Sequence, residues 1–485
     1  MNAAALAVAA LLGLLVLGVH LVDRHLRDRG GSRQRKAQGA RWANKRDLRA
    51  LQLDSPAPGR LILGRHGRRL IATDKRASVV VVGPSTISLK TSGFAIPAVL
   101  EWEGPVVAAS VKSDLLKTTI ERRRSLGKTM VYDPAGVTGH KSVQASPVAA
   151  CGTWRGAMRV AHRLAASARA AGAGGLEEAD FWYSAAEKLI APLLFAAASS
   201  GGGMAAVIDW LNEGPEAEEA VSECLKETGS KEARSAWRAN WNREERQRSS
   251  IYTTAETILG AYADPHLQGK SSPGQYTPAD LLDGGSNTLY LCAPAHEQER
   301  LRSVFAAMLS ELVALVYERS AQSGEPIDPP LLIVLDEAAN IAPMPDLEVV
   351  ASTGAGQGIQ LVTVFQDFAQ VSAVYGKHAN SIINNHRAKV FASGTADPDT
   401  LTYINRVVGE GEFHQRSETA GDQGRRTATV SSDYRDLAAA NVVRGAQPGS
   451  ALLVYGHLPP AWVALRPWFE DRALRELAEG SSDGN

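Results

Sequence analysis

Short apolar runs bounded by glycine or proline recur along this chain, and helical stretches separate several of them. Examples are SVVVVGP at residues 78–84, PVVAASV at 105–111, TMVYDP at 129–134 and PPLLIVLDEA at 329–338. A run that is apolar at every position, rather than at alternate positions, is typical of a strand buried on both faces of a parallel sheet. Because residues 92–101 and 113–126 have helical spacing, the sequence predicts an α/β domain with helices on both faces of its sheet.

The strand pattern disappears between about residues 153 and 265. The stretches with helical spacing there are 155–171, 177–199, 204–212, 217–227 and 231–259. Strand-like runs return at 286–294, 358–366, 388–393 and 450–456, and an earlier one, RLILGR, lies at 60–65. The sequence therefore predicts an all-α domain (153–274) inserted into an α/β domain whose two parts span 59–152 and 275–478. The polar residues 412–431 are expected to form a mobile loop, and 479–485 a disordered tail.

Composition limits the class of protein. With 485 residues, 44% of them hydrophobic and 21% charged, the chain has the composition of a globular protein of two or three domains. Cys151, Cys224 and Cys292 lie far apart in sequence, which argues against a disulfide framework or a structural zinc site. The net charge is zero, so the chain as a whole lacks the basic character of proteins that coat nucleic acid. Any contact with DNA is therefore expected at a few local basic sites.

The first residues predict a membrane anchor. Residues 3–22 contain no charged side chain, and a helix of this length spans about 30 Å, the thickness of the hydrocarbon core of a bilayer. A cleaved signal peptide or a buried helix is the alternative, but the basic segment that begins a signal peptide is absent. Ten Lys or Arg and three acidic residues follow between residues 23 and 49, and the positive-inside rule then places the bulk of the chain in the cytoplasm. We expect a single-pass cell-membrane protein with a transmembrane anchor at 1–23 and a flexible basic tether at 24–58.

An incomplete phosphate-binding motif follows the second apolar run. The run Val79–Val82 leads into Gly83 and, after a turn, into Lys90 and Thr91 at the start of a predicted helix. In a P-loop, backbone N–H groups at a helix N-terminus hold phosphates, a lysine neutralises their charge and a Thr hydroxyl binds Mg²⁺. Six residues rather than five separate Gly83 from Lys90, and Leu89 occupies the position before the lysine where glycine lets the backbone approach the phosphates. The segment therefore matches the Walker A pattern only in part.

A pair of acidic residues, Asp336 and Glu337, ends the apolar run 331–335. An aspartate at the carboxyl edge of a strand can hold the water shell of Mg²⁺, and an adjacent glutamate can orient or deprotonate an attacking water. Two acids after a buried strand are costly unless they meet a cation, and a solvated strand end is the alternative. Gln366 ends the next apolar run, where an amide can sense the γ-phosphate or position the water. Together these motifs predict an ATPase site that uses ATP and Mg²⁺.

The ordered series of motifs resembles the TraG/VirD-type coupling proteins of type IV secretion and conjugative DNA transfer. The resemblance spans residues 60–471, and its most specific part runs from Leu331 to Thr400, beginning LLIVLDEAANIAPMPDLEVV and ending SIINNHRAKVFASGTADPDT. It implies a RecA-like P-loop motor domain with an inserted all-α domain, a membrane anchor and a ring assembly, usually a homo-hexamer. Many members have two membrane helices, whereas this chain has one predicted anchor.

The resemblance also implies roles for individual residues. Lys90 and Thr91 match the Walker A pair, Asp336 and Glu337 the Walker B pair, and Gln366 the third-motif glutamine. The candidate site thus has three groups: catalytic Lys90, Glu337 and Gln366; nucleotide-binding Gly83, Pro84, Ser88, Lys90, Thr91 and Ser92; and metal-binding Thr91 and Asp336.

Basic residues elsewhere are candidates for two further roles. Arg387 follows the third motif and is a candidate for the arginine that a neighbouring subunit inserts into the site of a ring ATPase. A helix-surface arginine is the alternative. The clusters 122–124 and 425–426 are candidates for pore contacts with a phosphate backbone, or else are solvated runs of charge.

Three functions are compatible with the sequence. The first is a membrane-anchored coupling ATPase that drives single-stranded DNA, with an attached relaxase-type protein, to a type IV secretion channel. The second is a catalytically weak or inactive nucleotide-binding receptor that recruits the substrate to the secretion complex. The third is a double-stranded DNA pump of the FtsK kind, which the single anchor and the lack of a winged-helix tail disfavour. The first is the function that the sequence predicts.

Overall fold

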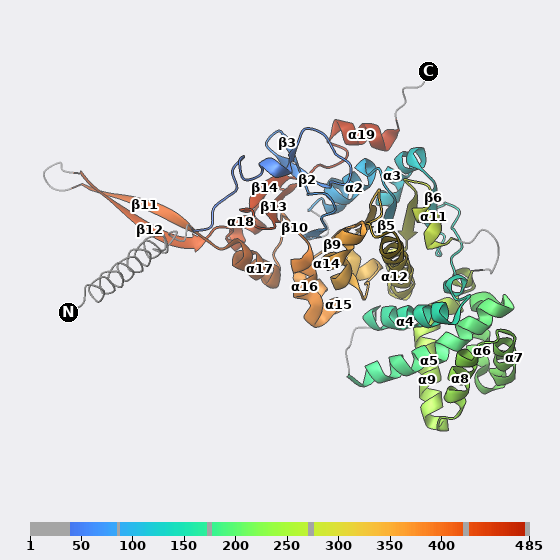
Figure 1. Ribbon diagram of the computed structural model, residues 1–485. Coiled ribbons are helices and arrows are strands. Elements are labelled where there is room, and N and C mark those ends of the chain that lie inside the picture. Colours follow the sequence, from blue (N-terminus) through green and yellow to red (C-terminus); the bar gives the residue numbers. More distant parts are fainter. Residues whose placement is uncertain (1–38, 85–87, 172–176, 270–275, 421–425, 481–485) are drawn as a thin grey trace, which may run out of the picture. The chain divides into compact units, whose positions relative to one another are not determined.

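The computed structural model describes residues 39–84, 88–171, 177–269, 276–420 and 426–480 (Figure 1). Contacts divide the chain into a larger unit, residues 42–408 with 438–485, and a smaller unit, residues 1–41 with 409–437. Within the described ranges no helix is both long and apolar enough to cross a bilayer. The anchor predicted at 3–22 lies outside those ranges, as does the tail from residue 481 onward.

A sheet of twelve strands forms the centre of the larger unit, in the order β1-β3-β2-β14-β13-β10-β4-β9-β8-β5-β7-β6. Its parallel part comprises β10 (Ala388–Ala392), β4 (Val79–Val82), β9 (Ile359–Phe365), β8 (Leu331–Leu335), β5 (Val106–Ser110), β7 (Thr288–Cys292) and β6 (Thr129–Tyr132). All of these strands except β6 are buried at every position. The continuous apolar runs therefore predicted a mostly parallel α/β sheet correctly.

The other part of the sheet is antiparallel. It comprises β1 (Gln52–Leu53), β3 (Arg69–Ala72), β2 (Ile62–His66), β14 (Ala461–Ala464) and β13 (Ser450–Tyr455), which pairs with β10. The run at 60–65 was expected in the parallel sheet, and that expectation is wrong. Only two residues connect β2 to β3, and the first, Gly67, has a φ of 63°. So short a connection can join antiparallel strands only.

Helices cover both faces of the sheet. The residues of one face, including Val79, Val81, Val362 and Val364, share a core with a π-helical turn (Thr91–Ala95), α2 (Ile96–Glu101), α3 (Ser113–Leu126) and α19 (Arg472–Glu479). The alternate residues point to the opposite face. Ile359 there lies beside α14 (Leu347–Gln357), and Tyr132 packs on Phe305 of α12 (Gln298–Ser323). The remaining helices of this part are α13 (Ala338–Ile341), α15 (Phe368–Tyr375), α16 (Ala379–Asn385), α17 (Pro398–Val408) and α18 (Ala440–Arg444).

The start of the larger unit changes the expected extent of the tether. Residues 24–58 were expected to be a flexible tether, but Leu48 and Leu51 are each 1% exposed and belong to the core beneath α2 and α3. The backbone amide of Ala43 also donates to the carbonyl of Pro460, 2.8 Å away. Residues 42–58 are therefore part of the folded unit, because Leu48 and Leu51 reach the core.

The described residues between 154 and 282 form helices and no strands. They are α4 (Trp154–Ala171), α5 (Glu177–Ser200), α6 (Gly203–Glu213), α7 (Glu218–Glu227), α8 (Lys231–Trp241), α9 (Glu245–Leu259), α10 (Pro265–Gln268) and α11 (Pro278–Leu282) (Figure 1). The stretch 231–259 was expected to form one helix. It forms two helices, α8 and α9, because residues 242–244 between them are not helical. Trp237 is buried against Trp241, as expected of an aromatic packing anchor, whereas Phe181 is 54% exposed.

The smaller unit contains a two-stranded antiparallel sheet of β11 (Glu410–Ala420) and β12 (Arg426–Asp436). The prediction of a mobile loop at 412–431 is therefore wrong. The two strands pair along their whole length, and their backbone groups satisfy one another in this ladder. Such pairing does not require an apolar face, so the polar composition of the segment concealed it.

Candidate functional site

The predicted phosphate-binding segment lies at the carboxyl edge of β4. Gly83 directly follows this strand, and its amide donates to the carbonyl of Phe365, which ends β9. A Cβ atom at residue 83 would lie 2.8 Å from the Cβ of Ala392 on β10, so this position suits glycine, which has no Cβ. Ser88 Oγ donates to the carbonyl of Pro84 across the loop. Residues 85–87, the middle of the loop, are outside the described ranges.

Lys90 points back into this loop. Its side chain is buried, and Nζ donates to the carbonyls of Gly83 and, at 3.3 Å, Phe365. Burial lowers the pKa of Lys90 to about 8, while the negative charges of Asp336 and Glu337 oppose that shift. The ammonium group therefore lies where the ends of β4 and β9 meet, close to both acidic residues.

Leu89 has a backbone conformation that branched residues rarely adopt. Its φ is 53°, in the left-handed region, where an L-residue is less stable by roughly 1–2 kcal/mol. Glycine adopts this conformation without the steric penalty. The backbone itself therefore gives a reason for glycine at this position, besides the close approach to phosphates that the sequence suggested.

Asp336 meets Thr91 at the end of β8. Thr91 Oγ1 donates to the two carboxylate oxygens of Asp336 at 3.1 and 2.9 Å, and Ser110 Oγ donates to Oδ2 at 3.1 Å. Burial raises the pKa of Asp336, and the hydrogen bonds from Thr91 and Ser110 act against this shift. Sequence reasoning missed Ser110, although it ends β5, the strand next to β8.

A chain of amide side chains links Glu337 to the third motif. Asn340 Nδ2 donates to Glu337 Oε2 at 3.2 Å, and Gln370 Nε2 donates to Asn340 Oδ1 at 3.2 Å. Gln370 Oε1 in turn accepts from the backbone amide of Gln366 at 3.0 Å. Gln366 is half-buried at the end of β9, between β4 and β8 in the sheet. Asn340 and Gln370 were not predicted, because their spacing after Glu337 and Gln366 is commonplace in helices.

The parallel strands thus bring the three predicted motifs together. β9 lies between β4 and β8, so Lys90, Asp336 and Gln366 emerge at one edge of the sheet. Among the described residues there is no cluster of three or more His, Cys, Asp or Glu side chains that would hold a metal alone. A hydroxyl beside one carboxylate instead suits Mg²⁺, because this ion keeps several water ligands and takes others from substrate phosphates.

Comparison with known proteins identifies the family. A family model for conjugative DNA transfer by the type IV secretory system matches residues 34–476. The chain belongs to this family. Protein VirD4 of Rhizobium rhizogenes is 25% identical over 413 residues, which cover 82% of this chain and 60% of that protein. This chain therefore spans about three fifths of that relative's length. VirD4 of Agrobacterium fabrum is 25% identical over 463 residues, covering 91% of this chain and 67% of that protein.

A solved coupling protein has the same fold. The bacterial conjugative coupling protein TrwB, in complex with sulphate, superimposes with a TM-score of 0.66 at 17% sequence identity, over 88% of this chain and 94% of that one. TrwB has also been solved in complex with ADP and Mg²⁺ and with a non-hydrolysable ATP analogue, at TM-scores of 0.65 each. This chain therefore has the fold of TrwB, with its large and mostly parallel sheet.

A segment near the C-terminus contacts the helix that follows Lys90 in this coupling protein. The amides of Arg466 and Trp468 donate to the carbonyls of Gly93 and Ser92, at 3.3 and 3.0 Å. Arg466 is itself buried and pairs with Glu101 at 2.8 Å and with Asp471 at 2.9 Å. The segment therefore fixes both ends of the helix that follows Lys90. Nothing in its sequence indicated this role.

Two arginines of the cluster at 122–124 differ in burial: Arg123 is buried and Arg124 is exposed. Arg123 was a candidate for DNA contact or for a solvated charge, and it is neither, because it is fully buried. Its guanidinium donates to Thr288 Oγ1 and to three backbone carbonyls, those of Trp102, Gly104 and Ser286. Burial lowers the pKa of Arg123 to about 10. Arg124 is exposed and pairs with Glu121.

Arg387 lies at the other edge of the sheet from Lys90. It directly precedes β10, which runs parallel to β4, whereas the phosphate loop follows β4. Its side chain pairs with Asp74 at 2.8 Å and lies over the ring of Tyr455. The structure therefore places Arg387 away from the nucleotide site of its own chain. Side chains of the second cluster, 425–426, are outside the described part.

Proposed function

We propose that this chain is a membrane-anchored coupling ATPase that delivers DNA to a type IV secretion channel. The contact between Thr91 and the buried Asp336 carries the proposal, because it joins the helix start of the incomplete phosphate loop to the acidic strand end. A hydroxyl and a carboxylate in contact at a strand edge are the pair that holds Mg²⁺ in P-loop ATPases. The solved complexes of TrwB with ADP and Mg²⁺ support the same ligands here.

The residues then divide the chemistry as follows. Lys90 exchanges its bonds to the carbonyls of Gly83 and Phe365 for the β- and γ-phosphates, assisted by the backbone amides at the start of the following helix. Thr91 and Asp336 would hold Mg²⁺, which when bound neutralises charge on the phosphates. Glu337 orients the attacking water and accepts its proton, and Asn340 holds that carboxylate in place. Gln366 lies on the strand between these groups, where it positions the water or contacts the γ-phosphate.

The proposal extends to the assembly and its partners. The charge-free stretch at 3–22 followed by basic residues supports a single-pass cell-membrane anchor with the larger unit in the cytoplasm. Family membership supports DNA as the substrate and the type IV secretory system as the partner. We propose further that the DNA is single-stranded and carries a relaxase-type protein. A homo-hexameric ring would let an arginine from one subunit complete the site of the next.

A nucleotide-binding receptor is a second candidate, and one observation favours it. Leu89 holds a strained conformation at the position before the lysine, and the loop is one residue longer than the Walker A pattern. Both features oppose the tight wrapping of backbone amides around phosphates that fast hydrolysis requires.

Hydrolysis of ATP by the full-length chain, assembled with Mg²⁺ and single-stranded DNA, separates the two functions. A motor hydrolyses ATP faster with DNA, and Glu337→Gln lowers turnover by about 10²–10⁴-fold while nucleotide still binds. Lys90→Ala should lose binding as well, whereas Lys117→Ala, an exposed lysine on α3, is the matched control. Nucleotide binding without turnover in the unmodified chain would establish the receptor. If the unmodified chain neither bound nor hydrolysed nucleotide, both functions would be excluded.

A further inference from the structure

The hydrogen bonds between Gln366 and Glu337 all point in one direction. The backbone amide of Gln366 donates to Gln370 Oε1 at 3.0 Å. Gln370 Nε2 donates to Asn340 Oδ1 at 3.2 Å, and Asn340 Nδ2 donates to Glu337 Oε2 at 3.2 Å. Each donor therefore lies on the side of the carboxylate. Hydrogen bonds in such a chain polarise one another, so the loss of one bond weakens the others.

The backbone of Glu337 is also fixed to the turn that carries Asn340. Glu337 has a φ of 67°, in the left-handed region that residues other than glycine rarely adopt. Its carbonyl accepts from the amides of Asn340 and Ile341 at 2.9 and 3.1 Å, and it is the N-cap of α13. Strained conformations persist where the surrounding structure holds them, and they concentrate at functional sites. The carboxylate and Asn340 therefore belong to one short, strained turn.

Gln370 does more than cap its own helix. Asp367 is the N-cap of α15, and its carboxylate accepts from the amide of Gln370 at 2.7 Å. In a capping box, the side chain three residues after the N-cap bonds to the amide of the N-cap itself. Gln370 instead bonds to the amide of Gln366, one residue earlier, and donates to Asn340, 30 residues away in the sequence. Its side chain therefore joins the end of β9 to α13.

We propose that Gln370 is a positioning residue of the ATPase site, because it couples Gln366 through Asn340 to the carboxylate of Glu337. A displacement of Gln366 at the end of β9 then changes the orientation of this carboxylate. Contact between Gln366 and bound nucleotide thereby regulates the group that activates water. This regulation rests on the proposed ATPase function, whereas the coupling itself is a property of the chain without nucleotide.

Hydrogen exchange at the Gln366 amide tests the coupling without ATP. The full-length chain in lipid nanodiscs is analysed by mass spectrometry that resolves single residues. Exchange should be about three- to tenfold faster in Asn340→Ala, although Asn340 does not bond to this amide. Gln370→Met, which keeps the length of the side chain and loses both hydrogen bonds, should increase exchange at least as much. Unchanged exchange in Asn340→Ala overturns the proposal, whether or not the chain hydrolyses ATP.

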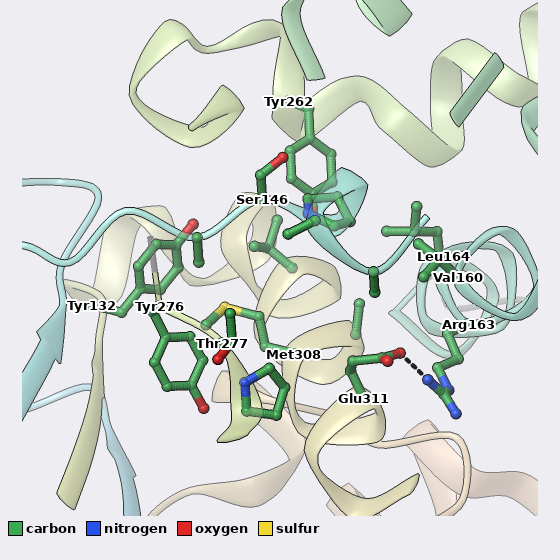
Figure 2. Close-up of a pocket in the computed structure, with 17 residues that line it drawn as sticks. Tyr132, Ser146, Val160, Arg163, Leu164, Tyr262, Tyr276, Thr277, Met308 and Glu311 are labelled. Atoms are coloured by element: carbon green, nitrogen blue, oxygen red, sulfur yellow. Dashed lines mark hydrogen bonds and ion pairs between the residues drawn. The ribbon is translucent and has the colours of Figure 1, made fainter. Parts of the chain in front are cut away.

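A substitution elsewhere in the larger unit separates the coupling from a general loss of stability. Val160 of α4 is 4% exposed and lines a cavity of about 200 Å³ between α4 and α12, which neither Asn340 nor Gln370 lines (Figure 2). Val160→Ala enlarges this cavity and should destabilise the larger unit. Exchange at Gln366 should nevertheless stay unchanged. An increase equal to that in Asn340→Ala would show general loosening and overturn the proposal.

Steady-state ATP hydrolysis tests the consequence for the site. Gln370→Met should lower kcat about three- to tenfold and change KM by less than about twofold, because Gln370 orients a carboxylate and does not bind nucleotide. Adding Gln370→Met to Asn340→Ala should cause little further loss, since Gln370 acts through Asn340. An unchanged kcat in Gln370→Met, or effects that multiply in the double variant, would overturn the proposal. If the unmodified chain hydrolyses no ATP, the motor is refuted, and exchange in Asn340→Ala alone supports or overturns the coupling.

Discussion

The residue before Lys90 offers a direct test of the phosphate loop. Leu89 has a φ of 53°, so its replacement by glycine should relieve steric strain that replacement by alanine leaves in place. Both substitutions remove the same half-buried side chain, and they differ only in the Cβ atom. The difference in stability between Leu89→Gly and Leu89→Ala therefore depends on two terms, the strain in the folded state and the greater freedom of glycine in the unfolded chain.

The expected magnitude follows from the backbone. A Cβ atom in the left-handed region is unfavourable by roughly 1–2 kcal/mol, whereas the greater freedom of glycine in the unfolded chain disfavours folding by about 0.4–1 kcal/mol. Leu89→Gly should therefore be more stable than Leu89→Ala by about 0.5–1 kcal/mol. In an ordinary helix the order is reversed, and Lys117→Gly on α3 should be about 1 kcal/mol less stable than Lys117→Ala.

Hydrogen exchange provides the assay, because it reports the free energy of local opening. The amide of Gly93 donates to the carbonyl of Leu89 at 2.6 Å, so a peptide covering residues 89–101 reports on the loop. The pair at Lys117 is the matched control in the same chain. If Leu89→Ala is as protected as Leu89→Gly, then Leu89 is not strained and the reasoning is refuted.

Other contacts in the larger unit give three predictions. Asn340→Ala should lower the kcat for ATP hydrolysis about tenfold or more and change KM by less than about twofold. The reason is that Asn340 holds the carboxylate of Glu337 and does not contact the nucleotide. Steady-state kinetics with an unchanged kcat would contradict this. Arg123→Lys should destabilise the larger unit by about 3 kcal/mol in urea unfolding, since one ammonium group cannot serve four acceptors, whereas Arg124→Lys on the surface should not. The pKa of Lys90 is lowered to about 8, and phosphates should raise it, so at pH 8.5 nucleotide binding should take up a proton. Calorimetry in buffers of different ionisation enthalpy would show this uptake, and Lys90→Arg should lose it.

The lowered pKa of Lys90 also affects stability. Between pH 8 and 10.5 the folded state binds fewer protons at this group than the unfolded state does. The contribution of Lys90 to stability therefore rises as the pH rises through that window. Phosphates that raise the pKa reverse the trend, so bound nucleotide should stabilise the chain more at pH 7 than at pH 10.

Strands and motif positions could be predicted because they depend on local pattern. Four successive valines before Gly83 and five apolar residues before Asp336 are typical of strands buried on both faces of a parallel sheet. The carboxyl ends of such strands share one edge of the sheet, so the strand pattern alone indicates that Lys90 lies near Asp336. Type of strand pairing was harder to predict, because RLILGR has an apolar run but belongs to a two-residue hairpin.

The features that the sequence did not reveal depend on contacts between distant residues. Arg123 lies between two other arginines in the sequence, a pattern typical of a charged surface cluster. Its hydrogen-bond acceptors nevertheless come from residues as far apart in the sequence as Trp102 and Thr288. Asn340 and Gln370 are ordinary helix residues until the fold brings them together.

The buried state of Lys90 argues against a phosphate loop that has lost its ligand. Desolvation disfavours the charged lysine in this position, and its hydrogen bonds to two backbone carbonyls offset only part of that penalty. An aliphatic side chain of similar length would fill the same space without the penalty. The strain at Leu89 adds to the cost of the same loop. Desolvation of Lys90 and strain at Leu89 both lie beside the contact between Thr91 and Asp336, and such unfavourable features cluster at functional sites.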